Sequence, residues 1–195
     1  MRSSPARPQS AVLIPVPDAE PVVGPWRRRY DPMAPAGVPA HITLMVPWLG
    51  PSVIDDAELA RLAAVVAKTG TFDFSLRDVA WFARRVLWLA PDPAGPFLDL
   101  IAGVAEEFEI PPWGGQFDEI VPHLTVAHAS EGLDLAPVAE TLDNDLPISC
   151  RAEEVWVMIG DGDRWWRRAA LPLRWPGPHP EPGRGGAGPR PIVGG

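Results

Sequence analysis

Two segments of this chain share one pattern: a histidine, an apolar residue, a threonine and a second apolar residue. The first is His41–Leu44, and the second, 82 residues later (123 minus 41), is His123–Val126. Successive side chains of an extended strand point to opposite faces, so each histidine shares a face with its threonine and the apolar residues share the other. The pattern predicts two strands, each with an apolar face towards a core and an imidazole and a hydroxyl on the opposite face.

The repetition of the pattern carries more weight than either copy alone. A single strand histidine two positions before a threonine is most simply a structural residue that hydrogen-bonds locally. Random placement of the four histidines and five threonines would give two such pairs in under roughly one chain in a hundred. We therefore interpret His41, Thr43, His123 and Thr125 as candidate site residues that act together.

The rest of the chain alternates between helical and extended patterns. Apolar residues three or four apart predict helices, and alternation or short apolar runs between turn residues predict strands. Helices are expected at 18–30, 55–68, 96–108 and 133–142, and strands at 11–16, 41–46, 72–76, 86–89, 122–127, 150–159 and 164–173. Asp18 is expected to cap the first helix, and the last two strands are expected to form a hairpin.

Each histidine strand is followed by a helix and then by a pair of strands. This order predicts an α+β fold built from a duplicated unit, in which two lobes of mainly antiparallel sheets are flanked by helices around a central groove. One histidine strand from each lobe would line that groove. Residues 11–175 are expected to form this two-lobed domain, between a disordered N-terminus at 1–10 and a disordered Gly/Pro-rich tail at 176–195.

Charge and hydropathy exclude some classes of partner. The net charge is −8 and the isoelectric point is about 4.9. An acidic surface repels backbone phosphates, so a broad basic face for long nucleic acid is not expected, whereas a small anion fits a locally positive cleft. No run approaches the roughly 18 to 20 apolar residues of a membrane span, so no membrane partner is expected. No protein partner is evident either.

Cys150 is the single cysteine of the chain. No disulfide can form within the chain, which favours a reducing, cytoplasmic location. A reactive nucleophile is the alternative interpretation of this thiol, and no neighbouring motif supports it.

The paired motifs, in a chain of this length and element order, resemble those of the two-histidine phosphoesterase superfamily. Over roughly residues 11–173 the chain is similar to the bacterial 2'-5' RNA ligase family, which includes RNA 2',3'-cyclic phosphodiesterases. The resemblance implies a phosphodiesterase that opens 2',3'-cyclic phosphates on RNA ends or small nucleotides. Reversible 2'-5' RNA ligation is a further activity that it implies, and it implies no metal or other cofactor.

The resemblance also implies roles for the four motif residues. His41 would be the general acid and His123 the general base of hydrolysis, and the two roles would exchange in the reverse direction. Thr43 and Thr125 would donate hydrogen bonds to the phosphate. Such roles meet the chemical need, because ring opening requires activation of water, protonation of the departing ribose oxygen and stabilisation of charge on the nonbridging oxygens. Unperturbed histidine titrates near pH 6.5, so both protonation states are accessible.

Other residues are weaker candidates. An arginine that holds the phosphate would be one of Arg84, Arg85, Arg151 and Arg167. An aromatic residue that stacks on a base would be one of Trp48, Phe82, Trp113 and Phe117, each of which is more simply a core residue.

His128 lies an odd number of residues after His123, so strand alternation places it on the opposite face. Neither histidine motif has a further ligand at the short spacing typical of zinc sites.

Two other classes of function stay open. A binding module of the same fold would recognise a nucleotide or an RNA end without turnover. Two intact motifs favour catalysis, since a binder has no need of two proton-transfer groups. A structural or partner-binding protein is favoured only by the nine tryptophans and the Pro-rich tail. ATP-dependent ligation is not expected, because the chain lacks both a Lys-x-Asp-Gly motif and a Gly-x-x-x-x-Gly-Lys loop.

Overall fold

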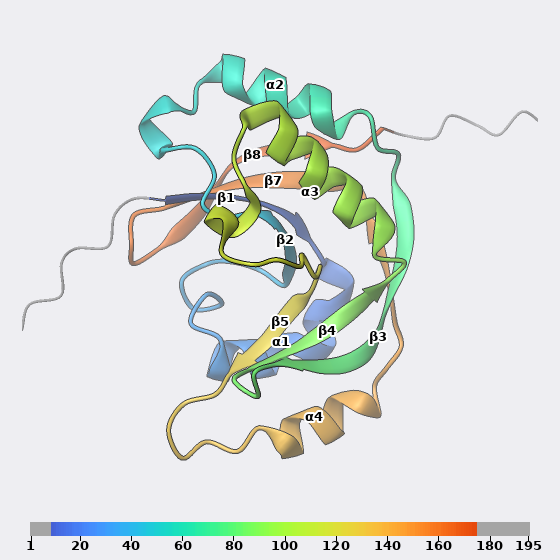
Figure 1. Ribbon diagram of the computed structural model, residues 1–195. Coiled ribbons are helices and arrows are strands. Elements are labelled where there is room, and N and C mark those ends of the chain that lie inside the picture. The colour runs from blue at the N-terminus through green and yellow to red at the C-terminus, as the bar shows by residue number, and fades with distance from the viewer. Residues whose placement is uncertain (1–8, 175–195) are drawn as a thin grey trace, which may run out of the picture.

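In the computed structural model, which describes residues 9–174, both histidine segments belong to antiparallel sheets (Figure 1). The strands are β1 (Gln9–Pro15), β2 (His41–Met45), β3 (Phe72–Phe82), β4 (Val86–Asp92), β5 (Leu124–His128), β6 (Ile148–Ala152), β7 (Glu154–Gly160) and β8 (Trp165–Pro172). The first sheet has the order β2-β1-β7-β8, and the second has the order β5-β4-β3-β6. Each sheet therefore carries a histidine strand at one edge, which confirms the predicted duplicated α+β fold.

The α-helices of residues 9–174 are α1 (Glu20–Tyr30), α2 (Asp56–Val66), α3 (Gly95–Phe108) and α4 (Ala136–Asp143). Two of them, α1 and α3, cross between the sheets. α1 follows β1 of the first sheet but packs against β5 of the second, whereas α3 follows β4 of the second sheet but packs against β2 of the first. Figure 1 shows α3 running beside α2, and these two helices are in contact. Because β2 and β5 also contact each other, the two histidine strands meet at the boundary between the sheets.

The apolar faces of both histidine strands lie in one continuous core. Ile42 and Leu124 are fully buried, as the sequence pattern predicts, and each belongs to the core that extends between the sheets and helices. Burial of one such side chain contributes about 1.5–3 kcal/mol. A second, smaller cluster that includes Leu13 and Met158 lies beside His41, on the other face of the first sheet.

Both histidine strands contain a β-bulge directly after the threonine. The pairing of β2 with β1 passes over Leu44, and the pairing of β5 with β4 passes over Val126. Each threonine is therefore followed by two consecutive buried residues, and the strand alternation resumes one residue out of phase. The position five residues after each histidine consequently returns to the face of the histidine and threonine. Val46 occupies this position in the first copy and His128 occupies it in the second.

Two expected strands have different bounds in the structure. The strand expected at 72–76 continues to Phe82 and turns at Ala83 and Arg84, whose φ angles are 47° and 55°. The single strand expected at 150–159 is wrong, because β6 pairs with β3 of the second sheet while β7 pairs with β1 of the first. Only Glu153 separates β6 from β7, so the sequence contains no turn that marks the change of sheet. The hairpin of β7 and β8 is confirmed.

The N-terminal boundary and the first helix cap also differ from expectation. β1 begins at Gln9, and Ser10 is fully buried and donates a hydrogen bond to the carbonyl oxygen of Leu49 at 2.6 Å. Asp18 does not cap α1, since its carboxylate accepts a hydrogen bond from the backbone nitrogen of Arg151 at 3.1 Å. Residues 1–8 and the tail expected at 176–195 lie outside the described residues. Within 9–174, no helix has the length and apolar character needed to cross a membrane.

Candidate active site

The two motif histidines are anchored in the same way. Nδ1 of His41 lies 2.7 Å from the carbonyl oxygen of Pro39, and Nδ1 of His123 lies 2.7 Å from the carbonyl oxygen of Val121. In both cases the partner is the residue two positions earlier in the chain. A carbonyl oxygen can only accept, so Nδ1 carries the proton of each ring, and Nε2 of the neutral imidazole is left as a proton acceptor.

The four candidate residues line two neighbouring cavities. His41 and Thr43 line a cavity of about 180 Å³, and His123 and Thr125 line a cavity of about 330 Å³. Thr125 and His128 line both cavities, so the two spaces meet between β2 and β5. Side chains of both motifs therefore border this junction, and Thr125 is common to the two cavities.

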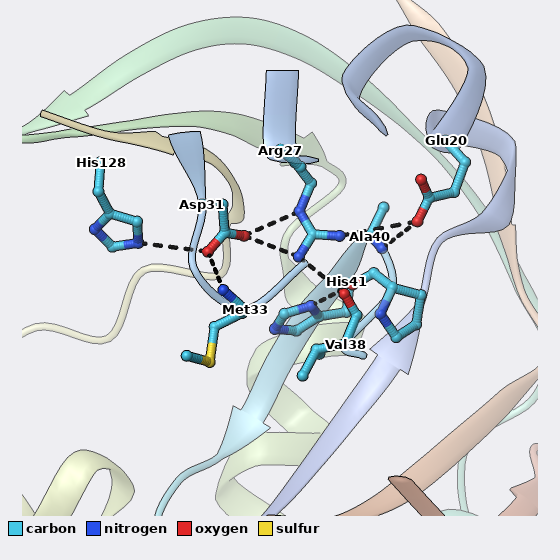
Figure 2. Close-up of polar contacts among 9 residues, drawn as sticks. Glu20, Arg27, Asp31, Met33, Val38, Ala40, His41 and His128 are labelled. Atoms are coloured by element: carbon cyan, nitrogen blue, oxygen red, sulfur yellow. Dashed lines mark hydrogen bonds and ion pairs between the residues drawn. The ribbon is translucent and has the colours of Figure 1, made fainter. Parts of the chain in front are cut away.

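His128 is a third histidine at the junction, and sequence alternation placed it on the wrong face. The bulge at Val126 corrects the prediction, because it returns His128 to the face of Thr125. A sequence signal for this bulge exists: in both copies two apolar residues follow the threonine, which breaks the alternation. Nε2 of His128 lies 3.9 Å from Oδ1 of Asp31, which is 3% exposed (Figure 2).

A buried ionic network lies beneath His41. The Arg27 guanidinium, 1% exposed, donates from Nε and Nη2 to Oδ2 of Asp31 at 3.1 and 2.9 Å. Nη2 also donates to the carbonyl oxygen of Val38 at 3.2 Å, and the backbone nitrogen of Ala40 donates to Glu20 (Figure 2). The network thus holds the segment that leads into His41 at two positions, Val38 and Ala40.

The surroundings of both imidazoles disfavour their charged forms. Burial lowers the pKa of His41 from 6.5 to about 4, and the positive charge of Arg27 adds to this effect, while the Pro39 carbonyl and Asp31 oppose it. Burial also lowers the pKa of His123, with a further contribution from His128. Both rings are therefore neutral at pH 7 in the free protein. A bound phosphate anion would stabilise the protonated rings and raise both pKa values.

Comparison with known proteins identifies the family. Residues 14–164 match the family model of the 2'-5' RNA ligase superfamily, and this range includes both histidine motifs. The chain belongs to the 2'-5' RNA ligase superfamily. Similar solved structures include E. coli LigT in complex with 3'-AMP, with 21% identity, 86% of this chain and 99% of that chain covered, and a TM-score of 0.53. They also include TT0787 of Thermus thermophilus, with 21% identity, coverages of 86% and 99%, and a TM-score of 0.55. No curated protein matches the sequence.

None of the four candidate arginines, Arg84, Arg85, Arg151 and Arg167, lines either cavity. Arg151 pairs with Asp73 at 2.7 Å, and the guanidinium of Arg167 lies 4.5 Å from the ring centroid of Trp156. Arg84 lines a separate cavity beside Trp81. No arginine or lysine is among the described residues that line the two motif cavities. Among the described residues that line the two cavities, His128 is the one side chain besides the motif histidines that can carry a positive charge.

The aromatic candidates divide into core and cavity residues. Trp48 is buried and packs edge-on against Phe108, with ring centroids 5.1 Å apart. Phe82, Trp113 and Phe117 all line the larger cavity beside His123. In this superfamily member the aromatic side chains are thus concentrated on one side of the junction.

Cys150 does not have the surroundings of a nucleophile. The thiol is buried, and burial raises its pKa to about 12, so the thiol is neutral and poorly reactive at pH 7. Within residues 9–174, no group of three or more histidine, cysteine, aspartate or glutamate side chains is placed to hold a metal ion.

Proposed function

We propose that this protein is a phosphodiesterase that opens 2',3'-cyclic phosphates on RNA ends or small nucleotides without a metal ion. The observation that supports it best is the matched pair of imidazoles, each with Nδ1 held by a carbonyl oxygen and each on one of two adjoining cavities. His41 and His123 act as the acid–base pair. Thr43 and Thr125 donate hydrogen bonds to the nonbridging oxygens.

The reaction replaces one oxygen on phosphorus by another, and it needs one proton transfer on each side of the phosphorus atom. One neutral imidazole takes a proton from water as the water oxygen bonds to phosphorus, and the bond from phosphorus to a ribose oxygen breaks. The second imidazole, protonated, gives its proton to that oxygen, which leaves as a hydroxyl. Each proton transfer contributes typically 10²- to 10⁴-fold to the rate. When a 5'-hydroxyl of RNA replaces water as the nucleophile, its oxygen bonds to phosphorus, the bond from phosphorus to the ribose 3'-oxygen breaks, and a 2'-5' phosphodiester is formed.

A binding module for a nucleotide or RNA end is the second candidate function. Neutral imidazoles attract an anion weakly, and a site built for phosphate binding alone is better served by arginine or lysine. The described residues that line the two cavities include neither. Titratable groups whose pKa is shifted by burial in a cleft are typical of functional sites, and the pKa values of both His41 and His123 are lowered in this way, which favours the enzyme over the binder.

The substrate of this proposal is a small nucleotide or an RNA terminus. The similar structures of LigT were solved with 3'-AMP, NADP+ or ATP, so nucleotides of this size occupy the same fold. We propose the cytoplasm as the location of the reaction, because the single, buried cysteine is stable under reducing conditions.

Turnover of a defined substrate in a chelator tests this proposal. Adenosine 2',3'-cyclic phosphate, and a short RNA that ends in the same group, are incubated with the protein in EDTA and followed by ³¹P NMR. We expect conversion to a phosphate monoester at an unchanged rate after chelation. Binding of the nucleotide without any product would contradict the proposal and support the binding module.

A further inference from the structure

The buried ion pair at the end of α1 has no part in the proposed proton transfers. Arg27 is 1% exposed and Asp31 is 3% exposed, so both charged side chains are withdrawn from water. Desolvation of two charges costs free energy, and apolar residues of similar volume often stabilise a core equally well or better. The core alone therefore does not require an ion pair here, and the other hydrogen bonds of the pair indicate a second role.

The network of this pair holds the backbone on both sides of Pro39. Nη2 of Arg27 donates to the carbonyl oxygen of Val38 at 3.2 Å, and the backbone nitrogen of Ala40 donates to Oε1 of Glu20 (Figure 2). Nη1 of Arg27 lies 3.8 Å from the same oxygen of Glu20, so the two contacts belong to one ionic network. Pro39 thus lies between two positions that the network fixes.

Pro39 supplies the carbonyl oxygen that anchors His41. Nδ1 of His41 lies 2.7 Å from this oxygen, and the hydrogen bond sets which ring nitrogen carries the proton. Proline has no backbone N–H to donate, so the direction of its carbonyl depends on the residues on either side. Contacts that fix Val38 and Ala40 therefore fix the acceptor for the His41 ring.

The ring of His123 is supported in a different way. Its Nδ1 lies 2.7 Å from the carbonyl oxygen of Val121, and the ring itself packs against two aromatic side chains. The ring centroids of Phe82 and Trp88 lie 4.8 and 5.8 Å from that of His123. The two motifs share the carbonyl anchor but differ in what surrounds it, and the ionic network belongs to the His41 side.

Two members of the network lie outside the motif cavities. Glu20 and Arg27 line a separate cavity of about 390 Å³, which adjoins the smaller motif cavity at Val38. A substrate at the junction would therefore meet His41 and not these two side chains. Asp31 does line the smaller motif cavity, and its Oδ1 lies 3.9 Å from Nε2 of His128, which connects the network to β5.

We propose that Glu20, Arg27 and Asp31 are positioning residues of the active site. They hold residues 38–40 so that the Pro39 carbonyl keeps the His41 ring in its Nδ1–H form and leaves Nε2 for the reaction. The inference rests on the proposed function, because it assigns a role to groups that act through His41. A displaced carbonyl would release the ring to the other tautomer and to other orientations.

The variants Glu20→Ala and Glu20→Gln test this inference with little risk to the fold, because 37% of the Glu20 side chain is exposed. Glutamine keeps an oxygen that accepts from the Ala40 nitrogen, and alanine has no acceptor. Nitrogen-15 NMR of the histidine rings at pH 7 identifies the tautomer. We expect a mixture of both tautomers at His41 in Glu20→Ala and the Nδ1–H form in Glu20→Gln, with His123 unchanged in both.

The kinetics of adenosine 2',3'-cyclic phosphate provide a second readout. Glu20→Ala should lower kcat by about tenfold, the scale of one hydrogen bond to a charged group, while KM stays unchanged. Glu20→Gln should restore the rate. Glu107→Ala is the matched control, because Glu107 is 36% exposed and accepts from Nε of Arg61 at 2.9 Å on the surface between α2 and α3. It should change neither the tautomer nor the rate.

A double variant tests the ion pair itself. Arg27→Met with Asp31→Leu removes both charges and leaves no buried charge without a partner. Calorimetry should show a melting temperature close to that of the unmodified protein, whereas His41 should show mixed tautomers and at least the loss of kcat seen in Glu20→Ala. A folded double variant that keeps the Nδ1–H form and full kcat would overturn the inference. If the double variant does not fold, the two Glu20 variants still test the proposal.

The tautomer measurement keeps this inference distinct from the proposed function, since it uses the free protein and needs no turnover. If the protein hydrolyses no cyclic phosphate but Glu20→Ala alone changes the His41 tautomer, the proposed function fails and the positioning of His41 stands. If the unmodified protein hydrolyses the substrate and both Glu20 variants keep its tautomer and its kcat, the positioning role is overturned and the proposed function stands.

Discussion

Replacement of His41 or of His123 by asparagine is expected to lower kcat/KM for adenosine 2',3'-cyclic phosphate by about 10²- to 10⁴-fold. The side-chain amide of asparagine can still donate a hydrogen bond towards the carbonyl oxygen of Pro39 or Val121, as Nδ1 does now. It has no group that accepts and releases a proton as Nε2 of histidine does. The variants therefore remove the proposed chemistry while they retain the local anchor. Initial rates measured with equal concentrations of folded protein give the comparison.

Two further variants control this experiment. The double variant His41→Asn, His123→Asn is expected to lose little more activity than either single variant, because residues that act as a unit are not additive. His128→Asn changes a histidine of the same groove that has no proposed proton transfer. We expect about tenfold loss from it, the scale of one hydrogen bond to a charged group. Single motif variants that retained as much activity as His128→Asn would contradict the acid–base assignment.

Asp31→Ala is expected to lower the free energy of unfolding by about 3–5 kcal/mol, since removal of one partner leaves a buried charge without compensation. The charge that is left is the Arg27 guanidinium, which is 1% exposed and donates hydrogen bonds to Asp31 from two nitrogens. Asp31 also accepts a hydrogen bond from the backbone nitrogen of Met33 at 3.0 Å. In a chain of this size, each kcal/mol shifts the melting temperature by about 2–4 °C, so calorimetry should resolve the change easily.

An exposed ion pair of the same chemistry provides the matched control. Arg77 and Asp92 pair at 3.0 Å, with 53% and 64% of their side chains exposed. Arg77→Ala is expected to change stability by less than about 1 kcal/mol, because water screens such pairs. If Asp31→Ala were no more destabilising than Arg77→Ala, the network beneath His41 would not have the role that its burial indicates.

Local sequence pattern was sufficient for the parts of the fold that depend on neighbouring residues. The faces of Ile42 and Leu124 follow from strand alternation, and both residues are buried as predicted. Asp55 caps α2, with its carboxylate accepting hydrogen bonds from two backbone nitrogens. The pair of histidine strands and the duplicated α+β order were predicted for the same reason, because each copy contains its own signal.

Features that depend on pairing between distant segments were missed. The bulges arise from the register of β2 on β1 and of β5 on β4, so alternation along the strand alone put His128 on the wrong face. Arg27 lies in the last turn of α1 and is buried against Asp31, four residues later in the chain. Phe82 lies against Trp88 and His123 because β3 continues past residue 76 and pairs with β4 as far as Phe82. Apart from the two apolar residues after each threonine, which break the alternation at the bulges, none of these features leaves a periodic trace in the sequence.

The central claim is that both motif imidazoles act on one phosphate, and NMR titration of the histidine rings tests it most directly. In the free protein, the pKa of His41 should lie near 4 and that of His123 below 6.5. Addition of adenosine 2'-monophosphate, the expected product or its isomer, should raise both pKa values, because the anion stabilises each protonated ring. A rise at only one histidine, or at neither, would contradict a shared phosphate site.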